Sequence, residues 1–252
     1  MMKLKVAVVI EARMGSTRLP GKVLAPIMER PMLSFLLERV KRAKTIDEIV
    51  VATTTKAADD KIEGLAKEEG VKVFRGSEED VLQRVTLAAQ ELRADAVVRL
   101  TADCPLVDWR IVDRLVKIYQ QGNYDYISNV IERSFPLGFD IEVFSFKKLQ
   151  EIEKTATEKV YREHPPYYFY AHPSKFRLKN WKAQGKMNWP DLRVTLDTKE
   201  DYLVLTKIFE ELYPKNSDFS AEEVVSLMRL HPEWAAINSQ IKHRHLPRPT
   251  VS

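Results

Sequence analysis

The chain has 252 residues, of which 44% are hydrophobic and 30% are charged, so it is long enough to form one large domain with a substantial core. This composition excludes collagen-like, disordered and disulfide-stapled proteins. The 40 Lys and Arg residues are nearly balanced by 36 Asp and Glu residues, and the net charge of +4 does not indicate a nucleic-acid partner. Cys104 is the only cysteine, which excludes a disulfide within the chain.

The first apolar run is short. It covers residues 6–10 and ends at Glu11, far below the ~20 residues that a membrane-spanning helix needs. It is also shorter than the apolar region of a secretory signal. We therefore expect no membrane association and a cytoplasmic location, with which the single cysteine agrees.

Apolar runs alternate with amphipathic segments along the first half of the chain. Strands are predicted at residues 4–10, 46–53, 71–74, 96–101 and 125–128. Helices are predicted at residues 32–43, 59–69 and 108–121, and another is expected after a capping box formed by Ser77 and Asp80. This alternation produces right-handed βαβ units. The sequence therefore predicts an α/β, Rossmann-like fold with a mostly parallel sheet and helices on both faces.

The second half of the chain is less regular. Strands are predicted at residues 138–144, 176–181 and 192–196, and a helical region at residues 158–170 is interrupted by Pro165 and Pro166. Two later helices are expected where capping boxes open them, at Thr198 with Asp201 and at Ser220 with Glu223. We expect one domain over residues 1–245, an irregular α+β insertion at about residues 131–190, and a flexible tail at residues 246–252.

A loop rich in glycine and basic residues follows the first predicted strand. Gly15 and Gly21 allow backbone N–H groups to turn toward an anion, and Arg13, Arg18 and Lys22 add three cations within ten positions. A bound triphosphate requires such groups, although a solvated basic loop also explains the composition. The loop is not a P-loop, because its glycines are separated by five residues and not by four.

Two aspartates follow apolar runs at the ends of predicted strands. Asp103 comes after residues 96–101, and Asp197 comes after residues 192–196. Ligands of parallel sheets bind at the carboxyl ends of the strands, and Mg²⁺ takes one or two carboxylates together with phosphate oxygens and water. Both aspartates are therefore candidate metal ligands. The alternative is that they cap turns or helices, which is the role we assign to Asp108 and Asp201.

Residues 12–24, with the sequence ARMGSTRLPGKVL, resemble the signature of the cytidylyltransferases that make CMP-activated acidic sugars. Shorter motifs occur in the order expected of this family, namely LTADCP at 100–105, GFDIEVF at 138–144, REH at 162–164 and LDTKED at 196–201. The chain is most similar to the branch that contains spore coat polysaccharide biosynthesis proteins. That branch is related to the 3-deoxy-manno-octulosonate and acylneuraminate cytidylyltransferases.

The resemblance implies a site built from the loop, the strand ends and the insertion. The expected nucleotide-binding residues are Ala12, Arg13, Gly15, Ser16, Arg18, Gly21 and Lys22. Arg13, Lys22 and Asp103 are the expected catalytic residues, and Asp103 and Asp197 are expected to bind Mg²⁺. The expected acceptor-binding residues are Asp140, Glu142, Glu163 and His164. Base choice is expected to depend on residues 51–55 and 74–76, which adds Thr53 and Arg75 to the nucleotide-binding candidates.

The implied reaction is attack of the anomeric hydroxyl of a sugar acid on the α-phosphorus of CTP, which forms a CMP-sugar and releases pyrophosphate. Mg²⁺ is expected to hold the phosphates and activate the hydroxyl, while Arg13 and Lys22 stabilise the leaving group. A homodimer with contacts in the insertion is also implied. Two alternatives stay open: a nucleotidyltransferase that uses another nucleotide or acceptor, and a nucleotide-binding module without catalysis.

Overall fold

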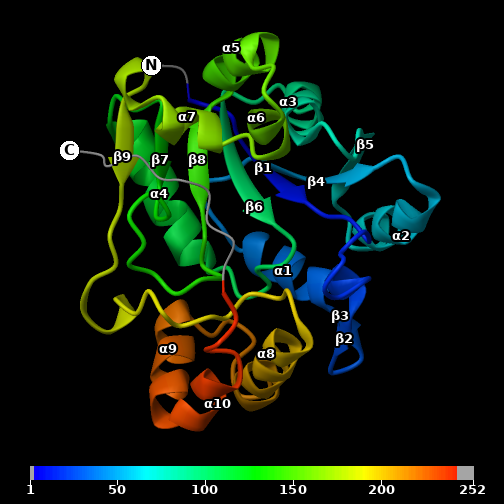
Figure 1. Cartoon of the computed structure of the whole chain (residues 1–252), viewed down its shortest axis with the longest axis vertical. Helices are drawn as coiled ribbons and strands as arrows, with labels where there is room; N and C mark the ends of the chain where they lie inside the picture. The colour runs from blue at the N-terminus through cyan, green and yellow to red at the C-terminus, as the bar shows by residue number, and fades with distance from the viewer. Residues whose placement is uncertain (1–2, 243–252) are drawn as a thin grey trace.

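A seven-stranded sheet with the order β5-β4-β1-β6-β8-β7-β9 forms the centre of the computed structural model, which describes residues 3–242 (Figure 1). β1 (Val6–Glu11) lies between β4 (Glu48–Thr54) and β6 (Ala96–Thr101), and β5 (Lys72–Gly76) pairs with β4. All four strands are parallel, so their carboxyl ends meet at one edge of the sheet. The predicted parallel core is confirmed.

The remaining strands come from the less regular part of the chain. β8 (Glu142–Ser145) is antiparallel to both β6 and β7 (Tyr126–Ser128), and β9 (Leu178–Asn180) is parallel to β7. β8 starts later than the predicted residue 138, because Gly138 has a φ of +121°, which does not fit a strand. The sheet is therefore mixed at this end and mostly parallel overall.

The strand predicted at residues 192–196 is wrong. This segment makes a single β-bridge, between Leu137 and Arg193, and it has no strand on either side. Its later backbone N–H groups bond elsewhere: Leu196 donates to the carbonyl of Asp103 at 2.8 Å, and Asp197 donates to the side chain of Asp201 at 2.9 Å. The segment is consequently held in the fold by loop contacts and not by a strand ladder.

Helices cover both faces of the sheet, as predicted (Figure 1). Side chains alternate along β1, with Val8 and Ile10 in one core and Ala7 and Val9 in the other. The first core is closed by α1 (Met32–Val40), α2 (Asp60–Glu68), α4 (Trp109–Gln121), α8 (Lys199–Leu212) and α9 (Ala221–Leu230). The second is closed by α3 (Val81–Glu91), α5 (Phe146–Thr155) and α7 (Tyr167–Ala171).

Shorter elements complete the described chain. They are the hairpin β2 (Pro26–Ile27) and β3 (Arg30–Pro31), the helices α6 (Lys159–Glu163) and α10 (Pro232–Ile237), and the 3-10 turns η1 (Lys22–Leu24), η2 (Ala57–Asp59), η3 (Pro173–Lys175) and η4 (Gly185–Met187). The prolines at 165 and 166 separate α6 from α7, as predicted. In residues 3–242 no helix has the length and apolar character needed to cross a membrane.

Most of the predicted helix starts are confirmed. The capping boxes of α8 and α9 are both formed, and Asp108 caps α4 by accepting a hydrogen bond from the backbone N–H of Arg110. The capping box predicted before α3 is wrong. Asp80 is itself the N-cap residue, and the Ser77 hydroxyl only accepts from the Asp80 N–H, so the helix begins at Val81.

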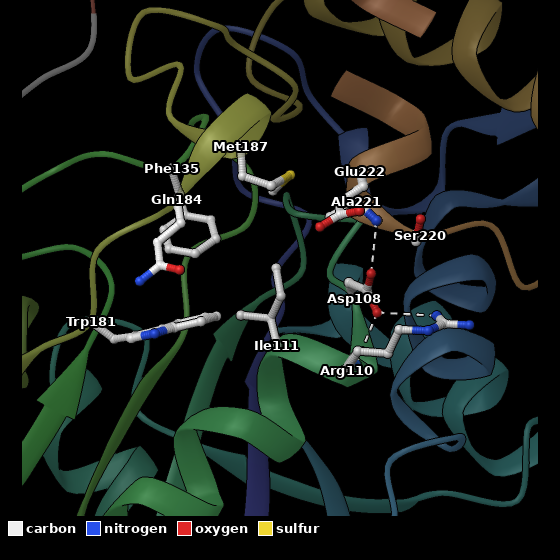
Figure 2. A pocket seen from close by; sticks show the side chains of 10 residues that line it. All are labelled: Asp108, Arg110, Ile111, Phe135, Trp181, Gln184, Met187, Ser220, Ala221 and Glu222. Carbon is white, nitrogen blue, oxygen red and sulfur yellow. Dashed lines mark hydrogen bonds and ion pairs between the residues drawn. The ribbon is translucent and has the colours of Figure 1, made fainter. Parts of the chain in front are cut away.

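A cavity of about 530 Å³ lies between the starts of α4 and α9 and the segment around η4 (Figure 2). Its wall combines apolar side chains, such as those of Phe135 and Trp181, with Asp108 at the start of α4. None of the residues that line it is among the predicted site residues. The tail predicted at residues 246–252 lies outside the described part of the chain.

Candidate active site

The predicted nucleotide loop folds back on itself beside the end of β1. The carbonyl of Met14 accepts hydrogen bonds from the N–H groups of Ser16 at 2.9 Å and Gly21 at 3.1 Å. Gly21 adopts a left-handed conformation with a φ of +71°, which directs the chain into η1. The Ser16 hydroxyl accepts a hydrogen bond from the N–H of Leu19 at 3.3 Å, so its side chain also shapes the loop.

A buried aspartate ties this loop to β4. Asp59 is 2% exposed, and its Oδ1 atom accepts a hydrogen bond from the Met14 N–H at 2.7 Å. Its Oδ2 atom accepts from the N–H and hydroxyl groups of Thr54 at the end of β4. Ala12 strengthens the same junction by donating to the carbonyl of Ala52 at 3.3 Å. The sequence pattern gave no indication of this role for Asp59, because the contact joins segments 45 residues apart.

Lys22 lies between the two predicted metal ligands. Its Nζ atom is 2.9 Å from Asp103 Oδ2 and 2.7 Å from Asp197 Oδ1. The Thr101 hydroxyl donates to Asp103 Oδ1 at 2.6 Å and fixes the orientation of that carboxylate at the end of β6. The structure therefore brings together three predicted site residues that lie up to 175 positions apart in the chain.

The charges in this cluster stabilise one another. Burial alone would lower the pKa of Lys22, but the attraction of Asp103 and Asp197 outweighs burial and raises it. Burial would likewise raise the pKa of Asp103, but Lys22 and the Thr101 hydroxyl hold it below its usual value. Lys22 is consequently protonated and Asp103 ionised at neutral pH.

Two arginines complete the surroundings of Asp197. Arg18, from the loop, and Arg193 each lie 3.1 Å from Asp197 Oδ2. Arg193 is 4% exposed and is held by the fully buried Asp201, which also opens α8. Arg193 was missed in the sequence, because its proximity to the site depends on the capping box that places Asp201.

The cluster fits Mg²⁺. Two carboxylates that share one Nζ atom are close enough to share a cation, and carboxylate oxygens are the ligands that Mg²⁺ prefers. No group of three or more His, Cys, Asp or Glu side chains in the described residues forms a cage for a metal. Such a two-carboxylate site leaves the remaining ligand positions of the ion to phosphate oxygens and water. This is the usual coordination of Mg²⁺ in proteins that bind phosphorylated substrates.

Arg13, near the start of the loop, contacts a carboxylate outside the cluster formed by Lys22, Asp103 and Asp197. Its Nη1 atom lies 3.7 Å from Glu78 Oε1, and Lys56 contacts the other oxygen of the same carboxylate. A Cβ atom on Gly15 would stand 3.1 Å from Glu78 Oε1, so only glycine leaves this approach open without displacement. Glu78 was not among the predicted site residues.

The two candidates for base selection occupy different surroundings. Thr53 is fully buried, and its hydroxyl has no hydrogen-bond partner among the described residues. The Arg75 guanidinium bonds to Asp60, Glu63 and the backbone carbonyls of residues 54 and 56, so it stabilises the junction of β4, β5 and α2. Nucleotide contacts by Thr53 and Arg75 remain predictions.

The four acceptor candidates also differ. Asp140 forms a two-fold ion pair with Arg133, at 2.8 and 2.7 Å. Glu142 is 6% exposed and accepts hydrogen bonds from Arg99 and from the Tyr126 hydroxyl. Both of its oxygens are thus engaged inside the protein, and burial, the largest effect, raises its pKa despite Arg99.

Glu163 and His164 lie at the end of α6. Glu163 is exposed, whereas His164 is partly buried, and burial lowers the pKa of its imidazole. The neighbouring charge of Glu163 opposes this effect of burial. Acceptor contacts by Glu163 and His164 stay predictions.

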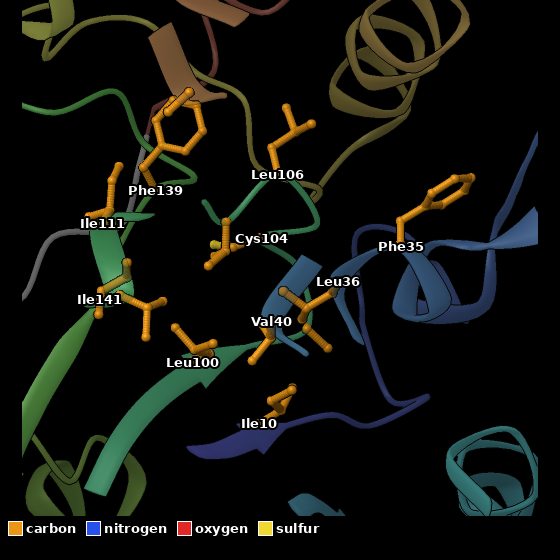
Figure 3. Close-up of a cluster of buried hydrophobic side chains, with 14 of the residues drawn as sticks. Ile10, Phe35, Leu36, Val40, Leu100, Cys104, Leu106, Ile111, Phe139 and Ile141 are labelled. Carbon is orange, nitrogen blue, oxygen red and sulfur yellow. The ribbon is translucent and has the colours of Figure 1, made fainter. Parts of the chain in front are cut away.

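Cys104 anchors the segment that carries Asp103. The thiol is buried in the core together with Leu100 and Leu106 (Figure 3). Burial, followed by the negative charge of Asp103, raises its pKa far above the usual value. A neutral, buried thiol is a poor nucleophile, so Cys104 acts here through packing.

Comparisons with known proteins agree with this geometry. The profile of the cytidylyltransferase family matches residues 7–237. The spore coat polysaccharide biosynthesis protein SpsF of Bacillus subtilis is 36% identical over 234 residues, which cover 90% of this chain and 95% of that protein. The structure of a cytidylyltransferase from Leptospira borgpetersenii is 36% identical, covers 96% of this chain and 100% of its own, and superimposes with a TM-score of 0.87.

A more distant structure supports the fold alone. It is that of CMP:2-keto-3-deoxy-manno-octonic acid synthetase complexed with CTP, which is 17% identical and has a TM-score of 0.63 over 82% of this chain and 99% of its own. The match of the family profile covers most of the described chain, and three of the predicted motifs meet where Lys22 contacts Asp103 and Asp197. The chain therefore belongs to the cytidylyltransferase family and is a nucleotidyltransferase.

Proposed function

We propose that the protein transfers CMP from CTP to the anomeric hydroxyl of an acidic sugar, with Mg²⁺ as cofactor, in the biosynthesis of a surface polysaccharide or another glycan. The observation that carries this proposal is the contact of Lys22 with both Asp103 and Asp197 at the carboxyl edge of the sheet. It joins a phosphate-binding cation to two candidate metal ligands, and the family defines the nucleotide chemistry. SpsF of Bacillus subtilis, by its name, supports a product used in a polysaccharide.

The reaction needs positioning and charge neutralisation more than a reactive side chain. The acceptor oxygen forms a bond to the α-phosphorus, the bond from that phosphorus to the bridging oxygen breaks, pyrophosphate leaves, and the hydroxyl proton passes to water. Mg²⁺, held by Asp103 and Asp197, would neutralise phosphate charge and polarise the acceptor hydroxyl. Arg13, Arg18 and Lys22 bind the triphosphate, and Lys22 balances the charge that develops on the leaving pyrophosphate.

The chain's own residues prepare this arrangement before substrate binds. Asp59 holds the loop against β4, Thr101 orients Asp103, and Arg193 orients Asp197. When the triphosphate enters, Lys22 and Arg18 exchange their carboxylate partners for phosphate oxygens. The released carboxylate oxygens then become available to the metal ion. Acceptor contacts by Asp140, Glu142, Glu163 and His164, and a homodimer, are further parts of the proposal.

One experiment separates this function from the two alternatives. Pyrophosphate release is measured with CTP, UTP, ATP and GTP, with and without Mg²⁺, over a panel of octulosonic and nonulosonic acids. We expect release with CTP and Mg²⁺ that disappears in the Asp103→Ala variant. Turnover with another nucleotide would show a different nucleotidyltransferase, and full turnover of Asp103→Ala would contradict the assigned metal site. Binding of a nucleotide without pyrophosphate release from any of the four would indicate a nucleotide-binding module without catalysis.

A further inference from the structure

The cavity between the starts of α4 and α9 and the segment around η4 has no part in the reaction described above (Figure 2). Its volume of about 530 Å³ lies within the range of small-ligand sites, which is about 300–1,000 Å³. No lining residue belongs to the nucleotide loop or to the cluster of Lys22, Asp103 and Asp197. The cavity is therefore a separate candidate binding site.

The floor of the cavity is held in place by hydrogen bonds between the two helix starts. Asp108 is 2% exposed, and its carboxylate accepts from the backbone N–H of Arg110 at 2.9 Å and from that of Ala221 at 2.7 Å. Arg39 of α1 donates to the two backbone carbonyls that precede Asp108 and Ser220, each at 2.9 Å. A ligand would therefore enter a preformed site, which lowers the cost of binding.

The cavity has an aromatic side and a polar side. Figure 2 shows the rings of Phe135 and Trp181 on one side and the carboxylates of Asp108 and Glu222 on the other. The two ring centroids are 5.0 Å apart. Phe135 is buried, whereas Trp181 is partly exposed, so a ligand can reach the Trp181 ring.

Two polar groups of the wall are free to bind a ligand. The amide of Gln184 and the carboxylate of Glu222 are exposed, and neither makes a side-chain hydrogen bond or an ion pair within residues 3–242. The amide can donate and accept hydrogen bonds, and the carboxylate can accept them. The Ser220 hydroxyl is already engaged, because it bonds to Glu223 in the capping box of α9.

The fixed charges around the cavity are balanced. Arg110 lies 3.3 Å from Asp108 Oδ1 and 2.7 Å from Asp218 Oδ2. Glu222 lies in the first turn of α9, where the partial positive charge of the helix N-terminus offsets its negative charge. An anionic ligand would meet Asp108 and Glu222, and a cationic ligand would meet Arg110 and two positive helix ends. The balance of charge therefore favours an uncharged ligand.

We propose that this cavity binds an uncharged sugar unit. A sugar ring has C–H groups on its faces and hydroxyl groups around its rim, which matches an aromatic side opposite a polar side. The C–H groups pack on the electron-rich face of Trp181, and the hydroxyl groups bond to Gln184 and Glu222. The inference goes beyond the proposed function: it assigns a second sugar site, and that site requires no nucleotide.

The test is an NMR titration of the ¹⁵N-labelled protein without nucleotide or Mg²⁺. The chain has four tryptophans, and the indole N–H signal of Trp181 is identified by its absence from Trp181→Phe. We expect at least one of glucose, rhamnose and N-acetylglucosamine to shift this signal, with a dissociation constant of about 1 mM. Glucosamine and glucuronate, which carry opposite charges, should bind about fivefold more weakly than that sugar.

Two variants test the assigned contacts, and saturation transfer to the sugar protons measures the affinity of each. Trp181→Ala should weaken binding about tenfold or more, and Glu222→Gln about threefold, since a neutral amide is a weaker acceptor. The matched controls are Trp234→Ala, at another partly exposed tryptophan, and Glu233→Gln, in the first turn of α10. Neither control residue lines the cavity, so both controls should keep the wild-type affinity.

Melting curves check that each variant is folded, and Glu222→Gln, at an exposed position, decides the question if Trp181→Ala does not fold. The site would be overturned if none of the three uncharged sugars shifts the Trp181 signal up to about 50 mM. Wild-type affinity in Glu222→Gln would overturn it as well. Tighter binding of glucosamine or glucuronate than of every uncharged sugar would refute the assignment to an uncharged ligand.

Discussion

Replacement of Lys22 by methionine would leave Asp103 and Asp197 without the cation that they share. Because Nζ is 2.9 Å from one carboxylate and 2.7 Å from the other, the two oxygens are no more than about 5.6 Å apart. Two unit charges at that distance repel by about 3 kcal/mol at an effective dielectric constant of about 20. Arg18 and Arg193 remain beside Asp197 and reduce the net cost to about 1–2 kcal/mol.

For a chain of this length, that loss lowers the melting temperature by about 5 °C. We expect this decrease for Lys22→Met in the presence of a chelator, and we expect saturating Mg²⁺ to restore most of it, because the ion replaces the missing charge. Wild type should gain much less from Mg²⁺, since Nζ competes for the same oxygens. Lys67→Met, which removes an exposed ion pair with Glu63, is the control and should change stability by no more than about 0.5 kcal/mol.

Thermal unfolding followed by circular dichroism gives the melting temperatures of wild type and Lys22→Met, each in Mg²⁺ and in chelator. No substrate is needed. The reasoning would be refuted by a Lys22→Met variant as stable as wild type in chelator. It would also be refuted by equal Mg²⁺ effects on the variant and on wild type.

Three further predictions follow from the site and the fold. Asp59→Asn should weaken CTP binding about tenfold, because an amide has one acceptor oxygen and cannot accept from both the Met14 N–H and the Thr54 N–H; an unchanged dissociation constant would argue against this role. Gly138→Ala should destabilise by about 3 kcal/mol, because its Cβ atom would meet a backbone carbonyl at 2.5 Å, whereas Gly70→Ala, with open space, should cost about 1 kcal/mol; urea unfolding compares them. Asp103 has a lowered pKa, so the stability that it contributes is present above pH 3.8 and is lost as the pH falls; urea unfolding between pH 3 and 7 should show a smaller acid loss in Asp103→Asn, and identical profiles would contradict this.

Much of the fold was predictable because the central strands are continuously apolar. Val8 and Ile10 point into one core while Ala7 and Val9 point into the other, so burial on both faces leaves an unmistakable run in the sequence. The hairpin of β2 and β3 escaped prediction for a local reason. Its turn places Met28 and Glu29 at positive φ. Turns of this kind usually contain glycine or asparagine, and neither occurs here.

The site was predictable to the extent that its residues occur in short motifs. Lys22, Asp103 and Asp197 each lie in such a motif, and the structure brings their side chains together. Asp59 and Arg193 could not be found in this way. Asp59 acts through a hydrogen bond with the distant Met14 N–H, and Arg193 is held in place by Asp201. α5 was missed since only Leu149 and Ile152 face the core, which is too weak a pattern to recognise.

The proposed function requires Asp103 and Asp197 to hold a divalent cation together with a nucleoside triphosphate. Titration of CTP into wild type and into Asp197→Asn, with and without Mg²⁺, tests it most directly. We expect Mg²⁺ to strengthen CTP binding to wild type by tenfold or more, on the order of 1.4 kcal/mol, and to have little effect on the variant. Equal CTP affinity of wild type with and without Mg²⁺, or an equal Mg²⁺ effect in Asp197→Asn, would contradict it.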